Sequence, residues 1–399
     1  SPAQQLADRI SAWFVPAVVG LALLTLAGWL LTGASGEDAL IHAVSVLVVA
    51  CPCALGLATP IALVAGANAA ARAGIIATDH GALETAGRVT RIVFDKTGTL
   101  TVGKPDMTFV RAFGDRRHAL AVAAALASRS DHPLDRVLAA AAVSEGLATP
   151  AVTEFTATPG GGLSGTIDGA IHLLGNAAFL VSAGIAQNKL DAALDDPLPD
   201  DAQSIVWLAR PDSGPIALFG FADQPRRGLS AMLAHLAELG IAVTVLSGDR
   251  QPSVTAFARR FGIDDARGDL RPDDKIRALG VLRDTDSVIA MVGDGLNDTP
   301  ALHAADIGVA MASGTEAAKA AASFTLNRSD LALVPKIILT GRATQATIRQ
   351  NLTLAFLFNG IGLPLAAAGK LSPALAGAAM ACSSIAVVTN AWALARRRL

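Results

Sequence analysis

Residues 92–101, I-V-F-D-K-T-G-T-L-T, decide the fold of this chain. An apolar, β-branched run over residues 89–94 stops abruptly at Asp95, and a small polar turn that contains glycine follows. A buried parallel strand that ends in a carboxylate at its C-terminal edge is where open α/β sheets hold their chemistry. An aspartate in that position can act as a nucleophile toward phosphate. The stretch therefore predicts an α/β domain that transfers phosphoryl groups and is organised around Asp95.

The polar turn after Asp95 suits a phosphate group. Lys96 places a positive charge next to the acid in the sequence. Thr97, Gly98 and Thr99 offer hydroxyls and unobstructed backbone N–H groups to phosphate oxygens. An isolated D-x-T-G string is equally compatible with an ordinary strand-to-loop turn and a solvated acid. The complete string, together with the motifs below, favours a phosphate-accepting aspartate.

The composition indicates a membrane protein. Of the 399 residues, 52% are hydrophobic and 17% are charged, and the mean hydropathy is +0.47. Soluble globular proteins are usually about 25% charged, so we expect much of this chain to lie in lipid. The net charge of -2 and the lack of a basic block beyond residues 396–398 argue against a nucleic-acid partner.

Charge-free runs predict four membrane spans, at residues 13–33, 39–71, 351–369 and 371–395. At about 1.5 Å per residue, the second run is longer than a hydrocarbon core of roughly 30 Å requires. We therefore expect it to break at Pro52 and Pro60 and to project beyond the bilayer. Arg342, Arg349 and the arginine-rich tail favour cytoplasmic termini and a cytoplasmic catalytic part. The expected location is the cell membrane, crossed several times.

The region between the outer spans reads as one domain inserted into another. Helical patterns cover 116–127 and 134–145, and short strands with glycine-rich turns cover 153–175. From Asp223, helices at 228–239 and 253–261 alternate with strands at 242–246 and 287–292, which implies a parallel sheet with crossover helices. The predicted units are spans in 1–74, an α/β domain in 75–105 and 220–336, an inserted α+β domain in 106–219, and spans in 337–399.

A second strand end and a lysine add groups that suit phosphoryl transfer. The strand over 242–246 ends at Ser247-Gly248-Asp249, where a hydroxyl can hold a phosphate oxygen. Lys275 lies at the start of an expected helix and can neutralise phosphate charge, although a single lysine usually lies on the surface. We assign these residues to the catalytic set around Asp95.

A third strand end supplies carboxylates. The strand over 287–292 runs into residues 293–298, G-D-G-L-N-D. Asp294 and Asp298 on this glycine-flanked turn suit Mg²⁺, which takes one or two carboxylates together with phosphate oxygens and water. Asn297 joins the catalytic set. Phosphoryl transfer needs little more than such positioning and charge neutralisation.

The inserted domain contains two weak nucleotide signals. His132-Pro133 precedes an expected helix, and Gly160-x-Gly162 lies in an expected turn. A histidine before a proline is more often an accident of a helix start, and Gly-x-Gly alone is common. Their joint presence between the two halves of a phosphoryl-transfer domain favours a nucleotide site.

Cys51-Pro52-Cys53 lies within the second apolar run and predicts a site for a soft cation. The proline removes a backbone N–H and kinks the helix, which lets both thiols point toward one cavity. Thiolates select Cu(I) or Zn(II). A structural thiol pair, a packing methionine and helix–helix hydrogen bonds are the alternatives. Polar and thioether groups of the last two spans are expected to face the same cavity: Asn359, Met380, Ser383 and Ser384.

Together these motifs resemble the heavy-metal-transporting P-type ATPases, most of all the copper(I) exporters. The resemblance covers essentially the whole chain. It implies a haloacid dehalogenase-like phosphorylation domain with an inserted nucleotide-binding domain, joined to a transmembrane helical bundle. It rests on residues 95–99, Cys51-Pro52-Cys53, His132-Pro133, Gly160-x-Gly162, Gly175-Asn176, residues 247–249 and residues 293–298.

The resemblance also implies roles for individual residues. ATP would phosphorylate Asp95, and Lys275 would support the transfer. The Mg²⁺ ligands would be Asp294, Asp298, Asp95 and Thr97. The contacts to ATP would come from His132, Pro133, Gly160, Gly162 and Asn176.

The motifs of the last spans favour copper, with departures. The copper(I) exporters carry Tyr-Asn and Met-x-x-Ser-Ser there, and this chain has Phe358-Asn359 and a Met-x-x-Ser-Ser string from Met380 to Ser384. Zinc exporters would show a charged Lys and Asp in these helices. Ala127 stands where the nucleotide domain usually has Glu. No Thr-Gly-Glu loop of an actuator domain occurs in a matching position, so we expect that domain to precede Ser1.

The sequence thus predicts ATP-driven movement of a soft cation, foremost Cu(I), out of the cytoplasm through an aspartyl-phosphate on Asp95. The expected cofactors are ATP and Mg²⁺. The expected partners are the metal ion, a cytoplasmic metallochaperone, the lipid bilayer and an N-terminal half with the actuator domain. The alternatives are a Zn(II) or Cd(II) ATPase and a non-pumping membrane fragment that binds or senses metal.

Overall fold

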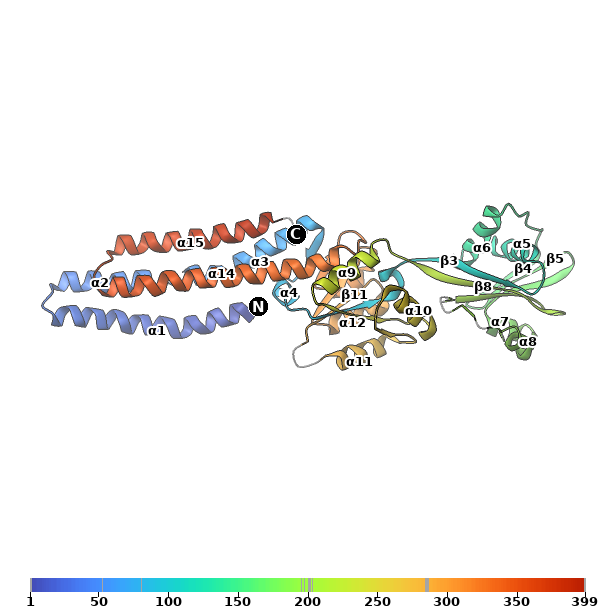
Figure 1. The fold of residues 1–399 in the computed structure, drawn as a ribbon, viewed down its shortest axis with the longest axis horizontal. Coiled ribbons are helices and arrows are strands. Elements are labelled where there is room, and N and C mark those ends of the chain that lie inside the picture. Colours follow the sequence, from blue (N-terminus) through green and yellow to red (C-terminus); the bar gives the residue numbers. More distant parts are fainter. Residues whose placement is uncertain are drawn as a thin grey trace.

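A computed structural model describes residues 2–397, apart from Pro52, His80, Asp195, Pro197, residues 200–201, Gln203 and residues 284–286. The molecule is elongated. A helical bundle lies at one end, a seven-stranded sheet with its helices in the middle, and a six-stranded sheet at the far end (Figure 1). This arrangement agrees with the predicted fold class, an α/β domain with an inserted α+β domain and a helical bundle.

The middle unit is a sheet with the order β1-β13-β12-β11-β2-β9-β10, in which every pair is parallel except β1 with β13. Strand β2 (Arg91–Asp95) lies in its interior, between β11 and β9. Its other strands are β1 (Ile75–Ala77), β9 (Ala242–Leu246), β10 (Asp265–Arg267), β11 (Ile289–Gly293), β12 (Ile307–Ala310) and β13 (Phe324–Leu326). Its helices are α4 (Gly81–Ala86), α9 (Leu229–Glu238), α10 (Gln251–Phe261), α11 (Pro272–Leu282), α12 (Thr299–Ala304) and α13 (Glu316–Ala321).

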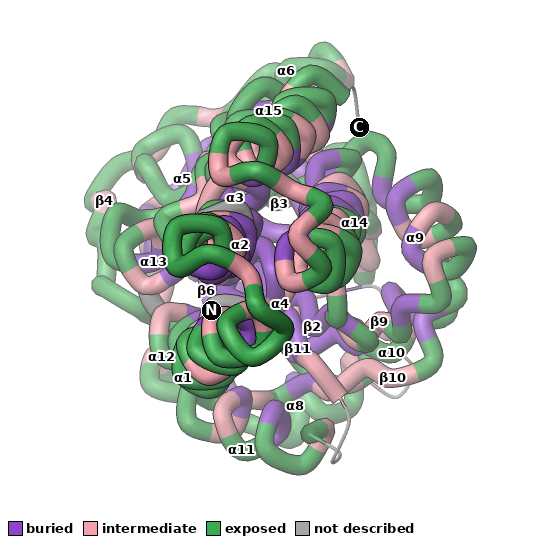
Figure 2. Tube along the Cα trace, turned by 90° about the vertical axis from the view of Figure 1, so that its left-hand side faces the viewer, coloured by how far each residue is buried: buried purple, intermediate pink, exposed green. Residues whose placement is uncertain are grey.

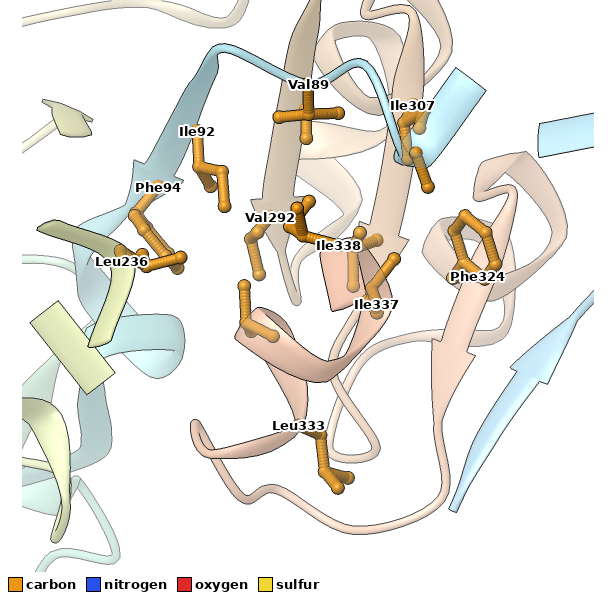
Figure 3. Close-up of a cluster of buried hydrophobic side chains, with 14 of the residues drawn as sticks. Val89, Ile92, Phe94, Leu236, Val292, Ile307, Phe324, Leu333, Ile337 and Ile338 are labelled. Carbon is orange, nitrogen blue, oxygen red and sulfur yellow. The ribbon is translucent and has the colours of Figure 1, made fainter. Parts of the chain in front are cut away.

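The core of the middle unit explains why β2 is apolar. Ile92 and Phe94 of β2 are fully buried and belong to one cluster with Ile337 and Ile338 of α14 (Leu333–Ala367), as Figure 3 shows. Val93, between them, packs into a separate cluster on the other side of the sheet. A strand covered on both faces is apolar throughout, without alternation. The same packing anchors α14 to the sheet that carries Asp95.

The far unit is an antiparallel sheet with the order β3-β8-β7-β6-β5-β4. Two buried clusters lie in this unit, one containing residues of α5 and α6 and the other residues of α7 and α8. The predicted domain boundaries, 105/106 and 219/220, fall inside β3 and β8. The elements are β3 (Thr101–Ala112), β4 (Thr153–Thr158), β5 (Gly162–Ile167), β6 (Ala170–Gly175), β7 (Ser204–Arg210), β8 (Gly214–Pro225), α5 (Arg116–Ala127), α6 (Pro133–Ser144), α7 (Ala177–Ser182) and α8 (Gln187–Ala192).

The helical bundle contains α1 (Pro2–Leu31), α2 (Gly36–Val49), α3 (Cys53–Ala73), part of α14 and α15 (Pro373–Arg396). Within the described residues, two helical segments are long and apolar enough to cross a membrane, Ala12–Leu31 and Pro373–Arg396. Large apolar side chains such as Leu24, Leu31 and Trp392 are exposed, and Figure 2 shows the outward turns of α1 and α15 in the exposed class. Apolar surface of this kind suits contact with lipid. The count of four spans stays a prediction.

The second apolar run breaks once in the structure. Helix α2 ends at Val49 and α3 begins at Cys53, so the break lies beside Pro52 as predicted. The predicted break at Pro60 is wrong, because α3 continues through it to Ala73. Neighbouring helices and local adjustments can satisfy the backbone groups that a proline frees inside a membrane helix. The cysteine motif therefore lies at a helix–helix junction.

Candidate functional site

The polar strand ends converge at the C-terminal edge of the middle sheet. Asp95 is the last residue of β2 and pairs with Leu246, the last residue of β9. Ser247 therefore follows β9 directly beside it. Asp294 follows β11, the neighbour of β2 on the other side. The parallel order thus brings the three predicted strand ends together, and Asp95 is only 5% exposed.

Three carboxylates and one ammonium form the centre of this edge. Asp95, Asp294 and Asp298 place ligand oxygens within 4.8 Å of one another. The Nζ of Lys275, from the first turn of α11, donates to Asp95 Oδ1 at 2.5 Å and to Asp298 Oδ1 at 2.7 Å. One lysine cannot neutralise three acids. The excess negative charge and the all-oxygen donor set fit Mg²⁺, so the predicted magnesium ligands, Thr97 apart, form a coherent site.

Burial and mutual repulsion control the ionisation of this cluster. Burial, and then the negative charge of Asp298, raise the pKa of Asp95 to about 7 although Lys275 acts against them. Burial and Asp298 also raise the pKa of Asp294. For Lys275, burial lowers the pKa, but Asp95 and Asp298 outweigh it and the net shift is upward. The cluster therefore holds a proton near neutral pH that a divalent cation would displace.

The raised pKa of Asp95 predicts that the affinity for Mg²⁺ depends on pH. Because the folded-state pKa of Asp95 is about 7, above its ordinary value of 3.8, the metal-free folded chain binds an extra proton between those pH values. Folding stability from this group therefore falls as pH rises through that window. Mg²⁺ needs the carboxylate, so its affinity should be about tenfold lower at pH 6 than at pH 8. Calorimetric titration measures this ratio, and an unchanged affinity would contradict the assignment.

Gly98 lets the turn after Asp95 approach the cluster. Its φ of +79° lies in the left-handed region, and a Cβ built on it would meet Asp294 Oδ2 at 2.1 Å. No L side chain fits both conditions without displacing the carboxylate. The sequence D-K-T-G thus contains glycine for a steric reason as well as a conformational one.

Replacement of Gly98 by Ala should therefore displace Asp294 and weaken Mg²⁺ binding at least about tenfold. The matched control is Gly114→Ala, because a Cβ at Gly114 meets nothing within 4 Å and its φ is not in the left-handed region. Both variants should be titrated with Mg²⁺ under the same conditions. Equal affinities for the two variants would show that Gly98 does not position Asp294.

The role predicted for Lys96, a positive charge beside Asp95, is wrong. Its side chain is fully buried, and Nζ lies 2.8 Å from Asp249 Oδ2 and donates to Ser253 Oγ at 3.2 Å. Successive residues of an extended chain point to opposite sides, so Asp95 and Lys96 diverge. Lys275 is the cation that contacts Asp95. Lys96 instead fixes Asp249 from the far side of the strand.

Asp249 and its partners brace the edge of the sheet. Thr97 Oγ1 donates to Asp249 Oδ2 at 2.8 Å, and the Asp249 N–H donates to Ser247 Oγ at 3.1 Å. Burial raises the pKa of Asp249, but Lys96 outweighs it and the net pKa is lowered. Asp249 is therefore an anion that holds the Thr97 turn. Gly248 lies within this loop, and Asn297 is exposed in the short helix η2 (Leu296–Asp298).

Two site residues were missed by sequence reasoning. The Nε of Arg226 donates to Thr99 O at 2.9 Å, and Nη2 donates to Gly98 O. Asp223 accepts from the N–H of Gly103 at 2.9 Å, and Thr101 donates to it as well. Both residues lie at the point where the chain returns from the inserted unit. This position was the only feature of the sequence that could have indicated their role. They hold the turn after Asp95 from a distant part of the sequence.

The predicted nucleotide residues gather around one cleft in the far unit. The cleft has a volume of about 520 Å³ and is lined by His132, Gly160, Gly162 and Asn176 among others. His132 caps α6 and its Nδ1 accepts from the Leu134 N–H at 3.3 Å, which leaves Nε2 for a ligand. Pro133 is the first residue of α6 and sets the start of that helix.

The glycines and Asn176 shape the wall of this cleft. Asn176 Nδ2 donates to Gly160 O at 2.9 Å, and Asn176 Oδ1 accepts from the Phe179 N–H at 2.8 Å. A Cβ on Gly162 would lie 2.4 Å from Leu174 O, so only glycine fits there. The amide of Asn176 is therefore used within the protein. It holds the glycine turn against the start of α7.

The predicted metal ligands also come together. Cys51, Asn359, Met380 and Ser384 line a cavity of about 30 Å³ between the end of α2 and helices α14 and α15. Ser383 and Phe358 line it too. Cys51 is disulfide-bonded in this structure, and only its reduced thiolate can ligate a metal ion. The side chain of Cys53 lies outside the described residues.

Comparison with known proteins identifies the fold family. A family profile described as haloacid dehalogenase-like hydrolase matches residues 89–306, and a second profile of that description matches residues 281–337. The chain belongs to the haloacid dehalogenase-like hydrolases. The matched region begins just before β2 and contains the whole carboxylate cluster.

Full-length relatives of this hydrolase chain are metal-transporting ATPases. It is 40% identical to the probable copper-transporting ATPase PacS of Synechococcus elongatus, over 99% of this chain and 54% of that protein. It is 38% identical to a silver exporting P-type ATPase of Salmonella typhimurium, over 100% of this chain and 50% of that protein. A crystal structure of a zinc-transporting PIB-type ATPase matches with a TM-score of 0.86 and 35% identity, over 98% of this chain and 64% of that one.

These homologues confirm the resemblance to heavy-metal-transporting P-type ATPases and the haloacid dehalogenase-like fold. The chain spans about half the length of the curated relatives it matches. The names of the relatives include copper, silver and zinc.

Proposed function

We propose that this chain is the ATP-binding, phosphorylated and metal-binding part of a pump that moves a soft heavy-metal cation, Cu(I), out of the cytoplasm. The observation that supports it most is the contact of Lys275 with Asp95 beside Asp294 and Asp298. Nucleophile, cation and magnesium ligands stand at one sheet edge, which is the set that phosphoryl transfer from ATP requires.

In the proposed reaction, a carboxylate oxygen of Asp95 attacks the γ-phosphorus of ATP. The bond from that phosphorus to the β–γ bridging oxygen breaks, and ADP leaves with the electron pair. Lys275 neutralises charge on Asp95 and on the transferred group. Mg²⁺, held by Asp294 with Asp298 and Asp95, would supply further charge neutralisation.

Soft donors in the bundle favour Cu(I) as the cargo. Cys51 offers a thiolate after reduction and Met380 a thioether, and both line the same cavity. The described lining contains no carboxylate or imidazole, which a harder Zn(II) site would favour. Zn(II) or Cd(II) transport remains the alternative, since a zinc-transporting structure is 35% identical to this chain.

Helix α14 connects the two sites physically. Its first turns pack under β2 through Ile337 and Ile338, and its later turns reach the metal cavity at Asn359. Gln345 Nε2 donates to Glu84 O at 2.6 Å, which ties the helix to α4. A rigid helix that contacts both sites can carry a displacement between them. We propose this helix as the link between phosphorylation and metal movement.

We also propose a location for this chain, a source of its metal ion and a route for phosphate release. The bundle lies in the cell membrane and the sheet units lie in the cytoplasm. A cytoplasmic metallochaperone delivers the metal ion. A Thr-Gly-Glu loop in a further segment, outside this chain, releases the phosphate from Asp95.

The test is acid-stable labelling of the reduced chain by [γ-³²P]ATP and Mg²⁺, with Cu(I), with Zn(II) and with a metal chelator. The proposal expects labelling that Cu(I) raises and Zn(II) does not. Labelling that only Zn(II) raises would support the zinc alternative. A lack of label under every condition would support a non-pumping membrane protein.

Cys51→Ser should remove high-affinity Cu(I) binding to the reduced chain, with a loss of at least about 100-fold, because a hydroxyl is a poor ligand for a soft cation. The matched control is Cys382→Ser, since Cys382 is a free and exposed thiol of α15. Competition against a Cu(I) chelator measures both affinities. Loss of binding in the Cys382 variant alone would place the site elsewhere.

A further inference from the structure

The nucleotide cleft contains a carboxylate that none of the predicted motifs includes. Asp135 follows His132 in the first turn of α6, lines the cleft and is 8% exposed. No residue in the described part of the chain gives it a hydrogen bond or an ion pair. A helix N-terminus favours a negative charge, and the carboxylate oxygens of Asp135 are open to the cleft, since they are not among the buried side-chain atoms without a partner in the described residues. The position of Asp135 therefore suits a carboxylate that accepts a hydrogen bond from a bound ligand.

The charge of Asp135 restricts which part of a nucleotide it can face. A triphosphate is strongly negative and would be repelled by a buried carboxylate. Only the base and the ribose offer N–H or O–H donors without negative charge. The lining of the cleft includes the apolar side chains of Leu134, Leu163 and Val206. Apolar walls suit the flat faces of a base, and the more polar ribose is better placed toward the solvent.

We propose that Asp135 reads the base by accepting a hydrogen bond from the 6-amino group of adenine. The inference rests on the nucleotide cleft of the proposed function and adds a specificity residue to it. His132 is the N-cap and Asp135 the third residue of α6, and both residues line the cleft. A site built around a hydrogen bond discriminates strongly against a ligand that lacks the donor.

The test compares ATP with purine riboside triphosphate, which lacks the 6-amino group and is otherwise the same molecule. Displacement of fluorescent trinitrophenyl-ATP from the full chain in detergent gives each affinity. The affinity for 2′-deoxy-ATP, which lacks the ribose 2′-hydroxyl, tests whether Asp135 contacts the ribose instead. GTP is less informative, because guanine also presents N–H donors to a carboxylate. The variants are Asp135→Ala and Asp135→Asn. The matched control is Asp168→Asn, an exposed acid outside the cleft.

The expected result is that the wild-type chain and Asp168→Asn bind ATP about tenfold more tightly than purine riboside triphosphate. Asp135→Ala should bind both equally, with the loss confined to ATP, and Asp135→Asn should keep part of the preference. An unchanged ratio in Asp135→Ala, or a loss of discrimination against 2′-deoxy-ATP alone, would overturn the inference and leave the nucleotide cleft intact. Failure of the wild-type chain to bind any nucleotide would overturn the cleft itself.

Discussion

Asp95→Asn is expected to abolish acid-stable labelling of the chain by [γ-³²P]ATP. The amide has no anionic oxygen to attack phosphorus and cannot form an acyl phosphate, so the label should fall to background instead of to a lower rate. The exchange keeps the shape of a side chain that is buried beside Lys275. The measurement is counting of acid-precipitated protein after seconds of incubation.

The matched control for this exchange is Asp264→Asn. Asp264 is exposed and lies on the same domain, so the variant makes the same chemical change away from the cluster. It should label like the wild-type chain. Equal label in Asp95→Asn and in the wild type would show that the phosphoryl group lies on another residue.

Lys275→Met should slow labelling by at least about 100-fold. Removal of one positioned donor to the reacting charge typically has an effect of this size. The ammonium is also the only cation that directly contacts Asp95 within the described residues. Without it, Asp95, Asp294 and Asp298 repel one another, and the metal-free chain should lose about 3 kcal/mol of stability, as expected when one partner of a buried ion pair is removed.

Two measurements separate the roles of Lys275 in transfer and in folding. Thermal unfolding with and without Mg²⁺ reports stability, and Mg²⁺ should restore part of the loss because it neutralises the same carboxylates. Labelling at saturating Mg²⁺ then reports transfer. Lys319→Met is the control, since Lys319 pairs with Glu316 on the surface. If the Lys275 variant is labelled at the wild-type rate in saturating Mg²⁺, Lys275 contributes only to stability and not to phosphoryl transfer.

The sequence was informative where local pattern and function coincide. The apolar run before Asp95 predicted β2, and the strands at 242–246 and 287–292 were placed to within two residues of β9 and β11. Parallel order then required their polar ends to meet, so the sequence alone was sufficient to assign Ser247 and Asp294 to the site. The separation of Cys51 and Met380 in the sequence did not predict that they are close in space. Their shared cavity was predicted from the metal-ligand chemistry of the two motifs.

Contacts that depend on side-chain direction or on distant segments were not predictable in the same way. Lys96 was placed beside Asp95 because the two are adjacent in sequence, and the extended backbone turns them to opposite sides. Arg226 reaches the turn at Gly98 only after the inserted unit has folded. Asp135 gave no signal because its burial is a property of the cleft and its residue type is ordinary in a first helical turn.

The shortest strands of the middle sheet were also not predicted from the sequence. Strands β1, β12 and β13 have three or four residues each and no periodicity that could be recognised in the sequence. They exist because β11 and its neighbours provide a template of unpaired backbone groups. The unbroken helix at Pro60 is a related case, since tertiary packing decides whether a proline ends a membrane helix.

The most direct test of the account is the chemical identity of the phosphorylated residue. The wild-type chain is incubated with Mg-ATP, reduced with borohydride, which converts an aspartyl-phosphate to homoserine, and sequenced by mass spectrometry. The account predicts homoserine at position 95 and unmodified aspartate at positions 249, 294 and 298. Homoserine at any of those three positions, or at none, would contradict it.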